Sequence, residues 1–131
     1  MVARTLLMVT ALAEAPIGVM LLFSPPLVAR LLLGAPLDAP AASIVGRIAG
    51  GALLGLSVAC WVARDDQQGL ALRGLIAAML LYNCEALGVL GHARDVMGLA
   101  GVLMWPAVAV HAALVVWCLA CLRSGPVTAA G

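Results

Sequence analysis

Four ionisable side chains interrupt the long apolar segments of this 131-residue sequence, and they are the first candidates for chemistry. They are Glu14, Arg47, Glu85 and His111. Ionisable groups are costly in hydrocarbon, so they usually face the interior of a helix bundle, where they form a packing network or a functional site. A helical rise of about 1.5 Å per residue places Glu14 and His111 at one depth near the midplane. Arg47 and Glu85 share a second depth, so the sequence predicts two pairs.

Glu14 is the stronger candidate for a functional site, because no arginine shares its depth. A low-dielectric environment disfavours the charged carboxylate, so this group could exchange protons and capture or release a cation. Pro16 and Gly18 follow closely and loosen the backbone hydrogen bonds beside it. In the alternative interpretation, a protonated Glu14, or one paired with His111, only holds helices together.

Arg47 and Glu85 are interpreted as a structural ion pair that closes the bundle. In the alternative, Arg47 extends toward the lipid headgroups. Tyr82 lies three residues before Glu85 and Asn83 lies in the same turn, so both could add hydrogen bonds. We include Tyr82 and Asn83 with Glu14 and His111 in the predicted ligand or proton site.

The cysteines suggest a second, weaker site. Cys118 and Cys121 form a Cys-x-x-Cys motif, a spacing found in redox and soft-metal sites. Cys60 and Met8 are expected at a similar depth, so thiols and a thioether there could hold Cu(I) or another soft ion. Cysteine is also an ordinary small apolar filler in helices. No phosphate-binding, zinc-protease or nucleophile motif is present, which favours a non-enzymatic protein and leaves any cofactor unidentified.

The composition indicates that membrane-spanning helices position these side chains. Apolar residues make up 65% of the chain and charged residues 10%, with a mean hydropathy of +1.16. Soluble domains carry about 25% charged residues, so lipid is the expected solvent. About 20 apolar residues cross a bilayer as a helix, and four stretches qualify. We predict an all-α, four-transmembrane-helix bundle forming a single integral membrane domain over residues 1–131, with spans at 5–24, 44–63, 70–91 and 96–122.

The connections between the spans differ in length. Tight hairpins are expected at 64–69 and 92–95, whereas the proline-rich first connection contains an apolar run, Leu27–Leu33, too short to span and expected in the interface. The start of the chain also has features of a secretory signal, but its apolar run continues past Glu14.

Four spans place both termini on one side of the membrane, named side A here; the opposite side is side B. Side A holds four arginines and side B three. Because cytoplasmic loops carry an excess of positive residues, this difference weakly favours termini in the cytoplasm. Side A has Arg4, Arg64, Arg73 and Arg123, and side B has Arg30, Arg47 and Arg94. The net charge of +1 without a basic tract excludes nucleic acid as a partner.

The second span carries Gly46-x-x-x-Gly50 and Gly51-x-x-x-Gly55. Small residues allow close approach of helices in lipid, so this helix is expected at the crowded centre of the bundle. The glycines either pack the monomer or form the interface of a homo-oligomer. A partner in a membrane complex is a further possibility.

The layout resembles small, uncharacterised bacterial membrane proteins of four helices, DoxX-like in organisation. The resemblance rests on the segments 47–54, 63–65, 81–83 and 105–113. It implies the four-helix fold, a multi-pass location in the bacterial inner membrane, and a role as accessory subunit of a quinone or thiol oxidoreductase.

The first span has a local likeness to small multidrug resistance transporters, in residues 12–14, 17–18 and 23–24. In that family one membrane glutamate alternately binds protons and cationic drugs, so the likeness implies that Glu14 is the coupling carboxylate. The chain departs from the family elsewhere, because it has no lysine and contains the long proline-rich connection.

Three functions therefore stay open. The first is a small membrane protein that binds or passes a small ligand, or supports a membrane complex, through the Glu14/His111 site. The second is a proton-coupled small-molecule transporter that uses Glu14. The third is the DoxX-like accessory subunit, with chemistry at the cysteines.

Overall fold

The computed structural model describes residues 2–66 and 69–124, and these residues form five helices and no strand. The predicted all-α fold is confirmed. In chain order the helices are α1 (Val2–Phe23), α2 (Pro25–Leu33), α3 (Pro40–Ala63), α4 (Leu70–Asp95) and α5 (Met104–Arg123).

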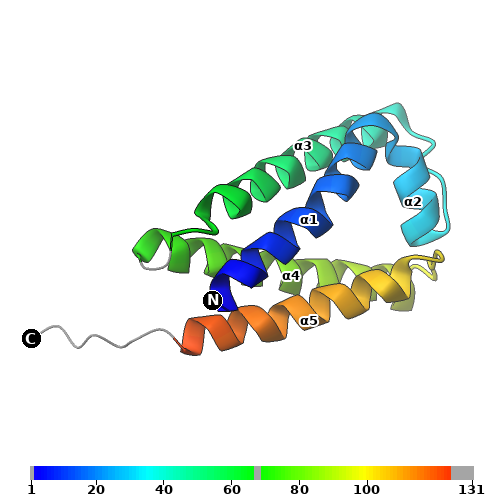
Figure 1. Cartoon of the computed structure of the whole chain (residues 1–131). Coiled ribbons are helices and arrows are strands. Elements are labelled where there is room, and N and C mark those ends of the chain that lie inside the picture. The colour runs from blue at the N-terminus through cyan, green and yellow to red at the C-terminus, as the bar shows by residue number, and fades with distance from the viewer. Residues whose placement is uncertain (1, 67–68, 125–131) are drawn as a thin grey trace, which may run out of the picture.

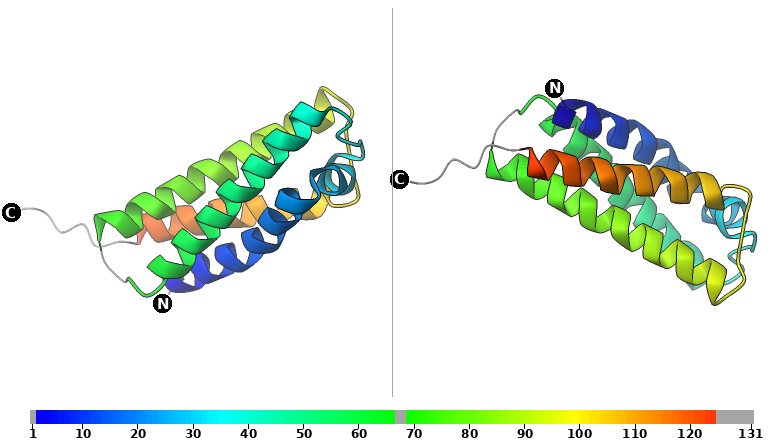
Figure 2. Two further views of the ribbon diagram at one scale, coloured as in Figure 1. Left: turned by 90° about the horizontal axis from the view of Figure 1, so that it is seen from above. Right: turned by 90° about the horizontal axis from the view of Figure 1, so that it is seen from below.

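The four long helices, α1, α3, α4 and α5, are each long and apolar enough to cross a membrane. They run along a common direction, which both views of Figure 2 show. The start of α1 and the end of α5 lie at the same end of the bundle, on the left in Figure 1, and this end is side A. The chain thus has the architecture of a multi-pass membrane protein whose outer helix faces contact lipid.

The long helices are organised as two pairs, α1 with α3 and α4 with α5, and contacts within each pair dominate the fold. We call them the α1/α3 pair and the α4/α5 pair. The α1/α3 pair packs closely because two glycines face each other. A Cβ atom added to Gly50 would lie 2.7 Å from the carbonyl oxygen of Gly18. Any side chain at Gly50 would therefore push the two helices apart.

The apolar core joins the two pairs in the half of the bundle nearest side A. Helices α1 and α4 contribute three residues each, and the buried residues of α1 recur every three or four positions along one face. The buried core consists of Leu6, Leu7, Ala11, Cys60, Leu72, Ile76, Met79, Leu114 and Cys118.

The short helix α2 occupies side B and lies across the direction of the long helices (Figure 1). It starts with two prolines and ends at Gly34, whose φ of 74° is favourable for glycine. The backbone N–H groups of Gly101 and Leu103 donate hydrogen bonds to the carbonyls of Leu32 and Leu31. The apolar run of the first connection is thus a separate short helix, bonded to the connection before α5.

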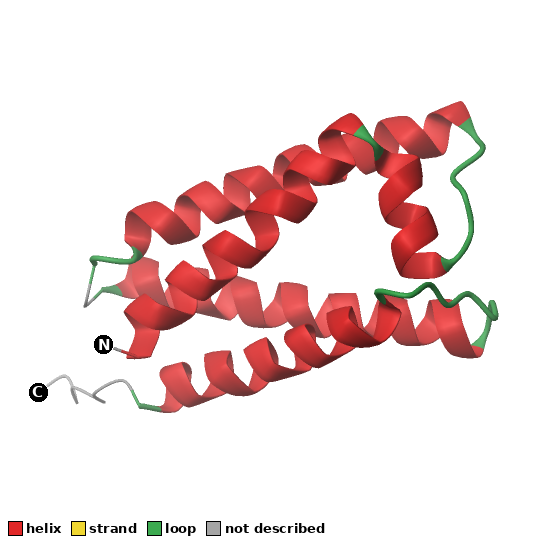
Figure 3. Cartoon of the chain, turned by 45° about the vertical axis from the view of Figure 1, so that its right-hand side comes forward, coloured by secondary structure: helices red, strands yellow, loops and turns green. Residues whose placement is uncertain are grey.

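Several helix boundaries differ from the prediction; α1 begins at Val2 and α3 at Pro40, instead of residues 5 and 44. Helix α4 continues to Asp95, so the predicted hairpin at 92–95 is its last turn, and α5 begins at Met104 instead of residue 96. The chain leaves α4 through Gly98, which has a φ of 67°. The loop at 96–103, drawn in green in Figure 3, is apolar although most of it is exposed, and its backbone bonds to α2 through Gly101 and Leu103. Apolar composition alone could not distinguish this loop from a helix.

The predicted central position of the second span is wrong, because α3 packs mainly against α1. Of its two glycine motifs, the first faces the fold: Gly46 lies against Pro25, and Gly50 lies against α1. Gly51 and Gly55 have open space where a Cβ atom would lie. The helix that is most buried among the four spans is α1.

Candidate functional site

Glu14 lies on the buried face of α1 and is only 5% exposed. Its Oε2 atom accepts a hydrogen bond of 3.0 Å from the hydroxyl of Tyr82, which belongs to α4. This contact is the only hydrogen bond to the Glu14 carboxyl within residues 2–66 and 69–124. No arginine or histidine of the same residues lies within ion-pair distance of it.

The hydrogen bonding continues from α4 to α5. The Tyr82 and His111 rings meet edge to face, with centroids 5.7 Å apart and an interplanar angle of 78°. Nδ1 of His111 lies 2.8 Å from Oδ1 of Asn83, which is fully buried. Glu14, Tyr82, Asn83 and His111, from three helices, therefore form one assembly, which we call the polar cluster.

The orientation of Asn83 fixes the tautomer of His111. Nδ2 of Asn83 donates a hydrogen bond of 2.7 Å to the carbonyl of Met79, one turn earlier on α4. A carbonyl can only accept, so Oδ1 of Asn83 is the atom that faces His111 and accepts from Nδ1–H. In neutral His111, Nε2 is then the free acceptor.

The four predicted site residues are brought together, but not in the predicted pairing. Glu14 and His111 do not contact each other directly, because Tyr82 lies between them and bonds to Glu14. The expectation that Tyr82 and Asn83 assist Glu85 is also wrong, since both face the interior and Glu85 is exposed. Equal depth identified the level of the cluster, whereas the direction of each side chain around its helix decided the contacts.

Sequence reasoning missed Thr10. Its hydroxyl is 1% exposed, and it is the one buried side-chain oxygen or nitrogen without a hydrogen-bond partner among the described residues. Thr10 precedes Glu14 by four residues, so the two share a face of α1. That spacing was the available signal. A buried hydroxyl without a partner is costly. A polar ligand atom bound near Thr10 and Glu14 would remove that cost.

The predicted ion pair between Arg47 and Glu85 is wrong. Arg47 donates from Nη1 to the carbonyl of Leu22, near the end of α1, and Glu85 lies exposed on α4. The reason is the pairing of the helices, because α3 packs on α1 and has few contacts with α4. The ion pairs of the described chain lie at side A instead, where Asp65 binds Arg4 at 3.1 Å and Arg64 at 3.4 Å.

The cysteines pack in or near the apolar core. Cys60 and Cys118 are fully buried in it, Cys121 is partly buried against it, and Cys84 is exposed; all four are free thiols. No group of three or more His, Cys, Asp or Glu residues that could hold a metal ion is found in the described residues. The proposed soft-metal site with Met8 therefore gains no geometric support, and a redox role of these thiols stays a prediction.

The polar cluster thus combines a carboxyl, a phenol, an imidazole and an amide; the carboxyl bonds to the phenol, and the imidazole contacts both the phenol and the amide. Such a set can hold, donate and accept protons, or bind a small cation at the carboxyl. Comparisons with protein-family models, with curated proteins and with solved structures found no match to this chain. The chemistry of the polar cluster is therefore the basis on which a function is proposed.

Proposed function

We propose that this protein is a proton-linked carrier of a small cation across a membrane, with Glu14 binding the proton and the cation in turn. The observation that carries the proposal is the isolation of Glu14. It is buried in a membrane-spanning helix, and within the described chain no positive side chain pairs with it.

A charge is costly in hydrocarbon. A buried carboxylate is stable only when a positive charge compensates it, or when a proton neutralises it. The Tyr82 hydroxyl supplies one hydrogen bond but no charge. A proton and a bound cation would each neutralise the same carboxyl, so binding of one displaces the other.

The position of Glu14 couples its charge to the arrangement of the helices. The bond between Tyr82 and Glu14 joins the α4/α5 pair to the α1/α3 pair. The other side-chain hydrogen bonds found between described helices join partners within a pair: Ser57 to Ala11, Arg47 to Leu22, Arg73 to Leu122 and His111 to Asn83. A cation at Glu14 changes a polar link between the pairs, which allows occupancy to shift their packing.

The neighbouring groups have separate roles in this proposal. Thr10 lies one turn before Glu14 on the same face of α1, and its hydroxyl has no partner within the described residues. Asn83 holds His111 in the tautomer that leaves Nε2 as an acceptor. We place side A in the cytoplasm, because it holds one arginine more than side B. The inner membrane of a bacterium is the location that the DoxX-like resemblance implies.

The test measures proton release on cation binding. The purified protein in detergent at low buffer capacity is titrated with tetraphenylphosphonium, followed by ammonium and alkali cations, while a dye reports pH. We expect about one proton released for each cation bound by the wild type. Glu14→Gln is expected to abolish release and to weaken binding.

Glu85→Gln is the matched control, because it removes a second membrane carboxyl that is exposed and outside the polar cluster. It should release protons like the wild type. Proton release that survives Glu14→Gln would assign the effect to another group. Failure of the wild type to release protons with any of these cations would also contradict the proposal.

A further inference from the structure

A groove between α1 and α3 opens on the lipid-facing side of the α1/α3 pair. Its volume is about 320 Å³, and apolar side chains from both helices line it. They include Leu12 and Ala15 of α1, and Leu54, Val58 and Trp61 of α3. Leu12, Val58 and Trp61 are exposed, so in a membrane this groove faces acyl chains and not water.

The floor of the groove is closed to polar ligands. Ser57 is its hydroxyl-bearing residue, and this hydroxyl donates a hydrogen bond of 3.2 Å to the carbonyl of Ala11. That bond satisfies the serine and ties α3 to α1. The groove therefore offers shape and apolar contact along the helix direction, which is also the direction of acyl chains in a bilayer.

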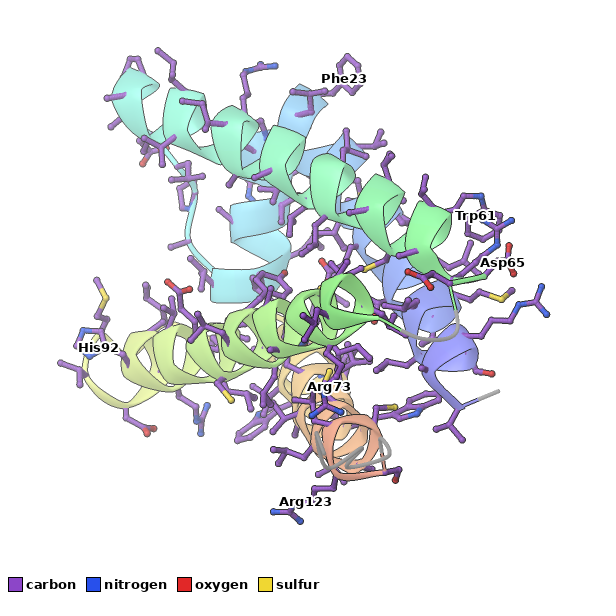
Figure 4. The ribbon with its side chains drawn as sticks, turned by 90° about the vertical axis from the view of Figure 1, so that its left-hand side faces the viewer. Phe23, Trp61, Asp65, Arg73, His92 and Arg123 are labelled. Atoms are coloured by element: carbon purple, nitrogen blue, oxygen red, sulfur yellow. The ribbon has the colours of Figure 1, made fainter. Side chains whose placement is uncertain are left out.

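Both walls of the groove end at side A in an arginine. On α1, Arg4 precedes Ala11 by seven residues and Ala15 by eleven, spacings that keep all three on one face. After α3, the Arg64 guanidinium lies over the Trp61 ring, 4.2 Å from its centroid, and also donates to the Trp61 carbonyl. Figure 4, which views the bundle from side A, shows Trp61 and Asp65 together at the end of α3, beside the start of α1.

The charge at this end is positive. Arg4 and Arg64 share the single carboxylate of Asp65, at 3.1 and 3.4 Å. Asp66 follows, and the described part of side A also holds Arg73 and Arg123, so four arginines stand against two aspartates there. Arginine binds phosphate oxygens in a forked geometry, and neither Arg4 nor Arg64 is buried.

From this geometry we propose that the groove of the α1/α3 pair is a binding site for an anionic phospholipid. One acyl chain lies along Leu12, Val58 and Leu54, and the phosphate lies at Arg4 and Arg64. The tryptophan separates the two regions, as aromatic side chains do at the level of the headgroups. This site is on the outer face of the α1/α3 pair and is independent of the polar cluster.

The test uses the fluorescence of Trp61. In the variant Trp105→Phe/Trp117→Phe, Trp61 is the remaining tryptophan. This variant is placed in phosphatidylcholine vesicles of two kinds. One contains a small fraction of brominated phosphatidylglycerol and the other the same fraction of brominated phosphatidylcholine. Bromine on the acyl chains quenches tryptophan on contact. We expect brominated phosphatidylglycerol to quench at about fivefold lower concentration, the effect of one arginine near the membrane surface.

Arg4→Gln/Arg64→Gln should remove this preference, whereas Arg123→Gln should keep it. Arg123 is at the same end of the bundle, on α5 and away from Trp61 (Figure 4). If the double variant does not fold, quenching of the parent variant is measured at two salt concentrations instead. Raising the salt from about 0.1 M to 1 M screens exposed charges and should remove the preference for phosphatidylglycerol.

Ala15→Leu tests the groove itself, because it fills the groove without changing charge and should lower quenching by both lipids. Ala112→Leu, at an exposed position of α5, is its control. Equal quenching by the two lipids in the parent variant would overturn the proposal. So would a preference that persists in Arg4→Gln/Arg64→Gln, or a Trp61 that neither lipid quenches because a second copy covers the groove.

Discussion

The Tyr82 hydroxyl donates a hydrogen bond of 3.0 Å to Oε2 of Glu14 and thereby connects α4 to α1 across the centre of the bundle. Both residues belong to helices long and apolar enough to span a membrane. The bond therefore contributes to the fold and also sets the environment of the carboxyl that we assign to proton and cation binding.

The contribution of this bond can be measured with a double-mutant cycle. Tyr82→Phe removes the donor and with it the bond, Glu14→Gln replaces the carboxyl acceptor with an amide, and the double variant completes the cycle. We expect a coupling energy of about 0.5–2 kcal/mol, the range of hydrogen bonds between membrane helices. The measurement is the free energy of unfolding in mixed micelles, followed by circular dichroism. Purely additive effects would show that the two side chains do not interact in the membrane.

A substitution of Thr10 is predicted to stabilise the fold, whereas removing the bond between Tyr82 and Glu14 destabilises it. Its hydroxyl is buried without a partner in the described structure, so replacing it with a methyl group removes a desolvation cost. Thr10→Val should raise the free energy of unfolding by about 1 kcal/mol, and it should weaken binding of the cation at Glu14. Thr10→Ser, which keeps the hydroxyl, should retain binding. A clear loss of stability in Thr10→Val would mean that the hydroxyl has a partner in the membrane.

The sequence predicted the four spans and the common level of Glu14 and His111. Hydropathy and length identified four spans, and the rise per residue placed Glu14 and His111 at one level, where the polar cluster lies. Hydropathy, span length and depth depend only on position along a helix. That position can be counted from the sequence.

The partners could not be predicted, because they depend on which helices are neighbours. Arg47 and Glu85 were matched by depth alone, but α3 and α4 belong to different pairs. Gly50 and Gly51 are adjacent in the sequence and equal in chemistry, yet one lies against α1 and the other faces open space. Helix rotation and helix order decide both cases, and neither follows from the hydropathy of a chain that is apolar on nearly every face.

The two adjacent glycines give a matched pair of variants. In Gly50→Ala the added Cβ would lie 2.6 Å from the backbone nitrogen of Leu22, so α1 and α3 must separate. Overpacking of this kind costs about 1–3 kcal/mol. Gly51→Ala adds a Cβ in open space and should stabilise the helix by about 0.5–1 kcal/mol. Thermal unfolding in detergent compares the two, and equal effects would contradict the close packing of α1 and α3 at Gly50.

Arg47 and Glu85 provide the last prediction. Arg47 donates to the Leu22 carbonyl, while Glu85 is exposed on a helix of the other pair, so the two should act independently. Arg47→Leu removes the bond to Leu22 and should destabilise the fold. Glu85→Leu replaces an exposed carboxyl within a span by an apolar group and should stabilise it, because ionisable groups facing lipid are costly.

The double variant Arg47→Leu/Glu85→Leu should then equal the sum of the single variants within about 0.5 kcal/mol. The free energy of unfolding in mixed micelles measures all three. A double variant that is much more stable than this sum would mean that the two charges attract each other in the membrane, and that α3 and α4 lie closer there than the helix pairs described above. Additivity would support the separation of the bundle into the α1/α3 pair and the α4/α5 pair.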